Sequence, residues 1–151
     1  MPTSSTAEPD LLALENQVCF ALALASRSVL ALYRPILEPM GLTHPQYLVM
    51  LALWQESPRS LKNIGAALQL DPATLSPLLK RLQASGYITR ERNAEDERVL
   101  DIALTDAGRE LRRRAEQIPP RIIEELGMSI DELTTLRENL HAVIAAATKE
   151  P

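Results

Sequence analysis

The sequence predicts a mainly α-helical chain with one small β-hairpin, arranged as a winged helix-turn-helix between long N- and C-terminal dimerisation helices. Leucines recur at helical spacing over residues 75–82, after a short helical segment whose inner face is Leu61, Ile64 and Leu68. From residue 87 the apolar period changes from about 3.6 to about 2, which is typical of strands. Apolar residues also recur at helical spacing through long stretches near both ends of the chain.

The helix expected between Asp71 and Gly86 has clear start and stop signals. Asp71 can accept from the free N–H groups of the first turn, and Pro72 fits the first helical position, where no N–H is needed. Gly86 suits the left-handed residue just beyond the helix end. A small, polar and basic outer face suits entry into the major groove of DNA. We expect the DNA contacts on that face to be Thr74, Ser76, Pro77, Lys80 and Arg81.

The segments that follow predict a hairpin, with alternating strands at 87–92 and 99–104 around a polar turn. Such a β-ribbon can form a wing that places an arginine on the DNA backbone or in the minor groove. We expect Arg90 and Arg98 to contact DNA, and Asp96 to orient Arg98. A leucine-rich helix pair alone is typical of ordinary core packing, and a charged hairpin tip alone is usually just exposed to solvent. A helix pair followed directly by a basic hairpin is more specific and favours DNA binding.

The flanking elements also carry boundary signals. We expect Asp10 to cap a long helix from Leu11, and residues 39–41 to end it. Further helices are expected after Thr43 or His44, after Ser60 and after Thr105, with Pro119 and Pro120 interrupting the last of these. Ser129 and Glu132 have the spacing of a capping box for the final helix.

This organisation predicts a disordered tail at residues 1–9 and a single domain at 10–151. Within that domain the winged helix-turn-helix covers about 58–104, and the dimerisation helices cover about 10–39 and 105–149. The first long helix is apolar around much of its circumference, which one small domain rarely covers, so we expect a homodimer. Its two reading heads would contact half-sites of a palindromic operator about one DNA turn apart.

Composition excludes several classes of protein. The formal net charge is −4 over 151 residues, but residues 80–114 hold nine Lys or Arg against seven Asp or Glu. One cysteine excludes an intrachain disulfide and a Cys-based zinc site, and the two histidines lie far apart. We therefore expect no metal and no cofactor. No uninterrupted apolar run approaches the roughly 20 residues of a membrane span, and no secretory signal is recognisable, so we expect a cytoplasmic protein without a membrane partner.

The wing residues 96–98 and the following residues 104–108 (Leu-Thr-Asp-Ala-Gly) resemble the MarR family of bacterial transcription regulators. Residues 14–22, 32–35, 41–48 and 75–82 resemble more narrowly the organic hydroperoxide-sensing (OhrR-type) repressors of that family. In that subgroup organic hydroperoxides oxidise a lone cysteine near the amino terminus, and the dimer then leaves its operator.

The resemblance assigns roles to three residues. Cys19 falls on the position of the redox-sensing cysteine, and Tyr33 matches the first of two tyrosines that bond the thiol. His44 stands where the second tyrosine is expected, either as a hydrogen-bond donor or, if protonated, as an ionic partner of the thiolate. Since the chain has no second cysteine, it resembles the one-cysteine kind, in which a low-molecular-weight thiol would cap the oxidised sulfur.

Helix geometry makes the dimer part of this sensor. Cys19 is expected about two turns into its helix, where the dipole has faded, and no nearby cation activates the thiol. Fourteen residues at 1.5 Å each separate Cys19 from Tyr33 by about 21 Å, so a contact requires the other subunit.

Other interpretations remain open at this stage. A phenolic or carboxylate ligand, bound near His44 and Tyr47, could release the repressor instead of thiol oxidation. A single-cysteine thiol peroxidase is a further alternative, but no paired acid–base groups or cofactor loop support it, so we predict no enzyme and no catalytic residue. A helical interaction module, which would have no affinity for DNA, is a third alternative. Cys19 could also be only a small buried apolar residue without a sensing role.

Overall fold

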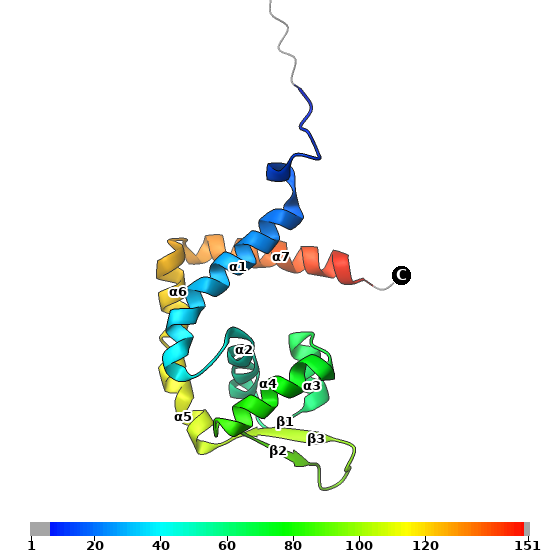
Figure 1. The fold of residues 1–151 in the computed structure, drawn as a ribbon, viewed down its shortest axis with the longest axis vertical. Coiled ribbons are helices and arrows are strands. Elements are labelled where there is room, and N and C mark those ends of the chain that lie inside the picture. Colours follow the sequence, from blue (N-terminus) through cyan, green and yellow to red (C-terminus); the bar gives the residue numbers. More distant parts are fainter. Residues whose placement is uncertain (1–6, 150–151) are drawn as a thin grey trace, which may run out of the picture.

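The chain separates into an upper pair of long helices and a lower globular unit, which α5 and α6 connect along one side (Figure 1). This computed structural model describes residues 7–149. The upper pair is α1 (Val18–Leu37) and α7 (Ile130–Thr148). The other elements, in chain order, are η1 (Leu14–Asn16), η2 (Glu38–Met40), α2 (His44–Gln55), β1 (Arg59–Ser60), α3 (Leu61–Leu68), α4 (Pro72–Ala84), β2 (Ile88–Arg92), β3 (Leu100–Leu104), α5 (Asp106–Ala115) and α6 (Ile118–Leu126).

The lower unit is a winged helix-turn-helix with a continuous apolar core, as predicted. Leu75, Leu79 and Leu82 of α4 are fully buried, and they share one cluster with Ile64 of α3. The cluster continues through α2 and the sheet to the end of α1, where Leu37 is buried. The end of α1 therefore belongs to the lower unit, whereas its beginning projects away from it.

The sheet has three antiparallel strands in the order β1-β3-β2, one more than the predicted hairpin. The hairpin register pairs Ile88 with Leu104 and Arg92 with Leu100. The third strand, β1, pairs Arg59 with Ile102. Because β1 has only two residues, it is too short to show the alternation of a strand, and the sequence pattern could not predict it.

Most of the predicted helix starts are confirmed by side-chain caps. The hydroxyl groups of Thr43, Ser60 and Thr105 accept from backbone N–H groups in the first turns of α2, α3 and α5. The Ser129 hydroxyl likewise accepts from the Glu132 N–H. A capping box also needs the Glu132 carboxylate to accept from the backbone N–H of Ser129, but here it accepts from the Ser129 hydroxyl, so the predicted capping box is only half formed.

The start of the first long helix was predicted wrongly. The Asp10 carboxylate accepts from the Leu12 N–H and so closes a local turn, and only the short η1 follows. Gln17 then takes an extended conformation and α1 begins at Val18. Helical spacing of apolar residues continued across this break, which hid it from sequence analysis. Residues 1–6 of the predicted disordered tail lie outside the described residues.

Both long helices leave apolar side chains uncovered in the single chain. Val18, Phe20, Leu24 and Leu30 of α1 are exposed, as are Leu136, Val143 and Ile144 of α7. Within residues 7–149, α7 contributes no buried side chain. By length and hydropathy alone, residues 18–40 could cross a membrane, although this helical stretch contains Arg27 and Arg34.

Candidate nucleic-acid interface and thiol site

The outer face of α4 presents the predicted DNA contacts on one surface. Asp71 accepts from the Thr74 N–H at 2.7 Å, and this bond holds the pKa of the Asp71 carboxyl below its usual range. The buried leucines fix which side of α4 faces inward. The five predicted residues lie on the other side, with Ser76 partly covered and the rest exposed, namely Thr74, Ser76, Pro77, Lys80 and Arg81.

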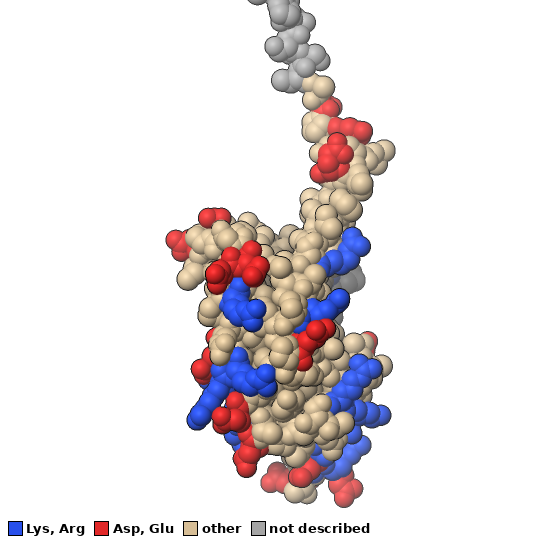
Figure 2. Space-filling view, turned by 60° about the vertical axis from the view of Figure 1, so that its left-hand side comes forward, with Lys and Arg blue, Asp and Glu red and all other residues tan. Residues whose placement is uncertain are grey.

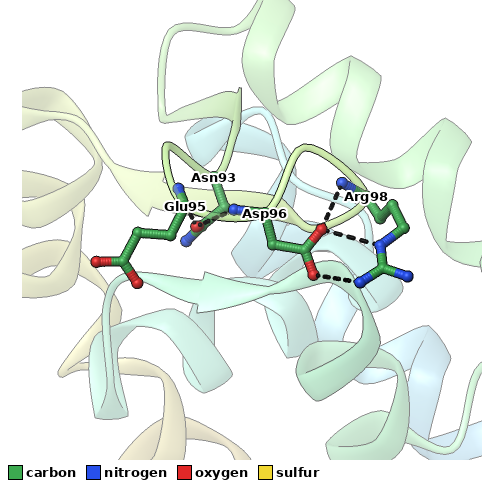
Figure 3. A network of polar contacts seen from close by, with 4 residues as sticks. All are labelled: Asn93, Glu95, Asp96 and Arg98. Carbon is green, nitrogen blue, oxygen red and sulfur yellow. Dashed lines mark hydrogen bonds and ion pairs between the residues drawn. The ribbon is translucent and has the colours of Figure 1, made fainter.

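The wing tip is organised by a polar network (Figure 3). The Asn93 side-chain oxygen accepts from the N–H groups of Glu95 and Asp96. The Asp96 carboxylate in turn accepts from the backbone N–H, Nε and Nη2 of Arg98, as its predicted orienting role requires. The side-chain bond from Arg98 is the main cause that lowers the pKa of Asp96. The Arg98 side chain remains 90% exposed, so this network presents it to the outside of the wing.

Arg90 lies at a different place from Arg98. It is half-buried in β2, and its Nε donates to the side-chain oxygen of Gln83 at 2.6 Å. Gln83 is in the last turn of α4, so this bond joins the helix to the wing. Sequence analysis missed Gln83, because its spacing from Arg90 crosses a turn and a change of secondary structure.

Basic side chains gather on the lower unit. Figure 2 shows a column of Lys and Arg down one side of the lower part of the molecule, with acidic side chains nearer its lower tip. The arginines of α5 are largely neutralised along their own helix, by the pairs Arg109–Asp106, Arg112–Glu116 and Arg113–Glu110. The chain is acidic as a whole, but it carries a local column of basic side chains on the lower unit, where α4 presents Lys80 and Arg81.

Cys19 is exposed in the first turn of α1, not two turns inside it. Its neighbours Val18 and Phe20 are exposed apolar residues. No side chain caps this end of α1, so Cys19 lies at an uncapped helix N-terminus. The predicted position of Cys19, two turns inside the helix, is therefore wrong.

Tyr33 and His44 do meet within one chain. Their ring centroids are 4.8 Å apart in an edge-on arrangement, and Tyr47 lies about 6 Å from both. Burial raises the pKa of Tyr33 and lowers the pKa of His44 below its ordinary value of 6.5. Burial also raises the pKa of Tyr47, to which the neighbouring Tyr33 contributes. The imidazole of His44 is thus held neutral at pH 7, which disfavours the ionic partner and favours the hydrogen-bond donor.

The ring cluster is connected through Trp54 to the start of α5. Tyr47 packs edge-on against Trp54 at 6.4 Å, and the Trp54 indole N–H donates to the Gly108 carbonyl at the start of α5. No pattern in the sequence indicated this connection, because Trp54 and Gly108 are 54 residues apart.

Cys19 does not reach this cluster in the single chain. It shares α1 with Tyr33, and fourteen helical residues separate the two by about 21 Å. His44 and Tyr47 also line two separate pockets, rather than one. The pocket of about 340 Å³ at the start of α2 contains His44, and one of about 420 Å³ between α2 and α5 contains Tyr47, Trp54 and Arg112. Among the described residues, no group of three His, Cys, Asp or Glu side chains could hold a metal ion.

Comparison with known proteins identifies the family. A family model described as transcriptional regulator SarA/Rot matches residues 31–114, which is more than half of the chain. The chain belongs to the SarA/Rot family of MarR-type transcriptional regulators. It is 43% identical to the transcriptional regulator TtmR of Methylorubrum extorquens, over 92% of this chain and 75% of that protein. It is 42% identical to the organic hydroperoxide resistance transcriptional regulator of Bacillus subtilis, over 87% and 95%.

Solved structures agree with this assignment. AbfR of Staphylococcus epidermidis is 38% identical and superposes with a TM-score of 0.75, covering 91% of this chain and 95% of that one. AbfR has been solved reduced on DNA, overoxidised on DNA and in a disulfide form. This MarR-type regulator is therefore a DNA-binding protein and not an enzyme, as predicted.

Proposed function

We propose that this regulator is a repressor that senses organic hydroperoxides by oxidation of Cys19 and then releases its operator. The observation that supports it most directly is the position of Cys19, exposed among uncovered apolar residues in the first turn of α1. The 42% identity to an organic hydroperoxide resistance regulator, and the oxidised forms of AbfR, point to the same chemistry.

A homodimer would complete the sensor. The exposed apolar faces of α1 and α7 fit burial against a second copy better than contact with water. In this proposal residues 10–149 form one domain, in which α1 and α5–α7 serve dimerisation. The protein then works in the cytoplasm, and a partner chain rather than a membrane covers α1. An antiparallel crossing of the two α1 helices would bring Cys19 of one subunit towards Tyr33 and His44 of the other.

The oxidation step balances with these groups alone. The Cys19 thiolate attacks the terminal oxygen of the hydroperoxide, the O–O bond breaks, and Cys19 becomes a sulfenic acid. The leaving alkoxide takes up a proton and departs as an alcohol. A low-molecular-weight thiol then condenses with the sulfenic acid to give a mixed disulfide and water, or further peroxide over-oxidises the sulfur.

The consequence for DNA would be geometric. A mixed disulfide adds bulk inside a packed seam, so α1 and its partner must shift. Because the end of α1 is part of the core of the lower unit, such a shift changes the spacing of the two reading heads on a palindromic operator. We assign the contacts with DNA to the α4 and wing residues, namely Thr74, Ser76, Pro77, Lys80, Arg81, Arg90 and Arg98, with Asp96 orienting Arg98.

Release by a small phenolic or carboxylate ligand is the second candidate. The pocket of about 420 Å³ supports it, because Tyr47 and Trp54 give it aromatic walls. Arg112 also lines it, paired with Glu116. In this alternative the ligand acts without any change at the sulfur.

Cys19→Ser separates the two candidates. We expect the variant to bind operator DNA as tightly as the wild type, but to stay bound when cumene hydroperoxide is added. Dithiothreitol should restore binding by the wild type after mild oxidation. A gel-shift titration measures all three, and peroxide-driven release of Cys19→Ser would overturn the assignment.

A further inference from the structure

The contact between Gln83 and Arg90 ties the recognition helix to the wing. Arg90 pairs with Ile102 across the hairpin, on the same face of the sheet as the buried Ile88. Since α4 packs against β2 on this face, the Arg90 stem lies between helix and hairpin. The Gln83 bond therefore fixes the guanidinium group at the seam between the two elements.

This guanidinium is fixed without being neutralised. Arg98 at the wing tip pairs with the Asp96 carboxylate, whereas Arg90 is held by a neutral amide oxygen. Among residues 7–149, no carboxylate forms an ion pair with Arg90, and neither of its Nη groups makes a hydrogen bond. Its full charge and its outer fork of N–H groups remain available to an external anion.

We propose that Gln83 is a positioning residue for DNA binding, which aims the Nη groups of Arg90 at one phosphate of the backbone. A guanidinium fork matches the geometry of a phosphate, and a side chain already held in place loses less conformational entropy on binding. Phosphate contacts set affinity and register rather than sequence preference. The inference depends on DNA binding by the family and is independent of the chemistry at Cys19.

Two substitutions at Gln83 test the charge and the geometry separately. The probe is a duplex of about 30 base pairs, or three helical turns, selected by the wild-type protein from a random-sequence library. Gln83→Glu keeps an oxygen beside Arg90, but its negative charge neutralises the guanidinium group, so affinity for the duplex should fall about ten-fold. The salt dependence, log K against log salt, should become shallower by about 0.9, the equivalent of one phosphate contact. Gln83→Leu frees Arg90 but leaves its charge, so affinity should fall about three-fold with an unchanged salt slope.

A double-mutant cycle distinguishes positioning from the general effect of an added negative charge. In an Arg90→Ala background, Gln83→Glu should change affinity less than about two-fold, because the group it neutralises is gone. Circular dichroism and urea unfolding verify that each variant folds. If Gln83→Leu or Arg90→Ala binds as tightly as the wild type, or if Gln83→Glu weakens binding equally with and without Arg90, the proposal is overturned. Failure of the wild type to select any duplex would refute DNA binding itself, which is a different result.

Discussion

The ring of His44 meets the ring of Tyr33 edge-on, with centroids 4.8 Å apart, and this contact joins the start of α2 to the second half of α1. Burial shifts the two groups in opposite directions, with the pKa of Tyr33 raised and that of His44 lowered. Both shifts favour the neutral forms, so at pH 7 the pair consists of a phenol and an uncharged imidazole.

The depressed pKa of His44 predicts a loss of stability in mild acid. The unfolded chain binds a proton at His44 as the pH falls through about 6.5, whereas the folded chain resists it until a lower pH. Between these two pKa values stability falls as the pH falls, and above about 6.5 this residue contributes no pH dependence. Urea unfolding from about pH 7.5 to about pH 5 should therefore show a component that His44→Tyr removes.

His141, exposed on α7, supplies the control for this experiment. His141→Gln should keep the acid-dependent component that His44→Tyr loses. An unchanged pH profile in His44→Tyr would mean that His44 protonates as easily in the folded chain as in the unfolded one.

The sequence predicted the lower unit well because its signals are local. The Asp71 cap, the leucine spacing of α4 and the period change after Gly86 each act within a few residues, and the structure confirms all three. The start of α1 failed for a related reason, since the apolar spacing of residues 11–18 does not distinguish a helix from a turn followed by η1. Contacts between distant segments, such as Trp54 with Gly108, leave no periodic trace in the sequence. The proposed second subunit would be indicated only by exposed apolar faces.

Glycine is required at position 108 because the backbone of Tyr87 passes close to it, and not because of an unusual backbone angle. A Cβ atom added there would lie 2.1 Å from the Tyr87 carbonyl oxygen, which also accepts from the Thr105 N–H. The backbone would have to move apart where α5 meets the turn between α4 and β2, so Gly108→Ala should lower the free energy of unfolding by about 3 kcal/mol. Urea denaturation with far-UV circular dichroism measures it.

Gly127→Ala is the matched control, because a Cβ there meets nothing within 4 Å and the only obstacle is a φ of +63°. Its cost should be about 1 kcal/mol, the usual penalty for a left-handed alanine. Equal destabilisation by the two substitutions would contradict the close-approach explanation for Gly108.

Arg98 should contribute to operator affinity through its presentation by Asp96. We expect Arg98→Ala to weaken operator binding about ten-fold at matched salt, about 1.4 kcal/mol. Asp96→Asn frees the charge of Arg98 but removes its orienting bonds, so it should change affinity less than Arg98→Ala does. Arg109→Ala, which removes an equal charge from α5, is the control and should have little effect. Fluorescence anisotropy measures the three, and wild-type affinity in Arg98→Ala would remove the wing tip from the interface.

The proposed dimer makes a prediction about one face of α7. Leu136, Val143 and Ile144 are each more than two-fifths exposed, and helical spacing places them on the same side of the helix. If a second copy covers this side, Leu136→Glu buries a charge in an apolar seam and should weaken dimerisation at least about thirty-fold, or about 2 kcal/mol. Ala145→Glu puts the same charge on the opposite side of α7 and should leave the dimer intact. Sedimentation equilibrium at micromolar concentration separates these outcomes. Because the proposed sensor takes Tyr33 from the partner subunit, Leu136→Glu should also slow oxidation of Cys19. Equal oxidation rates in monomer and dimer would show that the reactivity of Cys19 does not depend on the subunit interface.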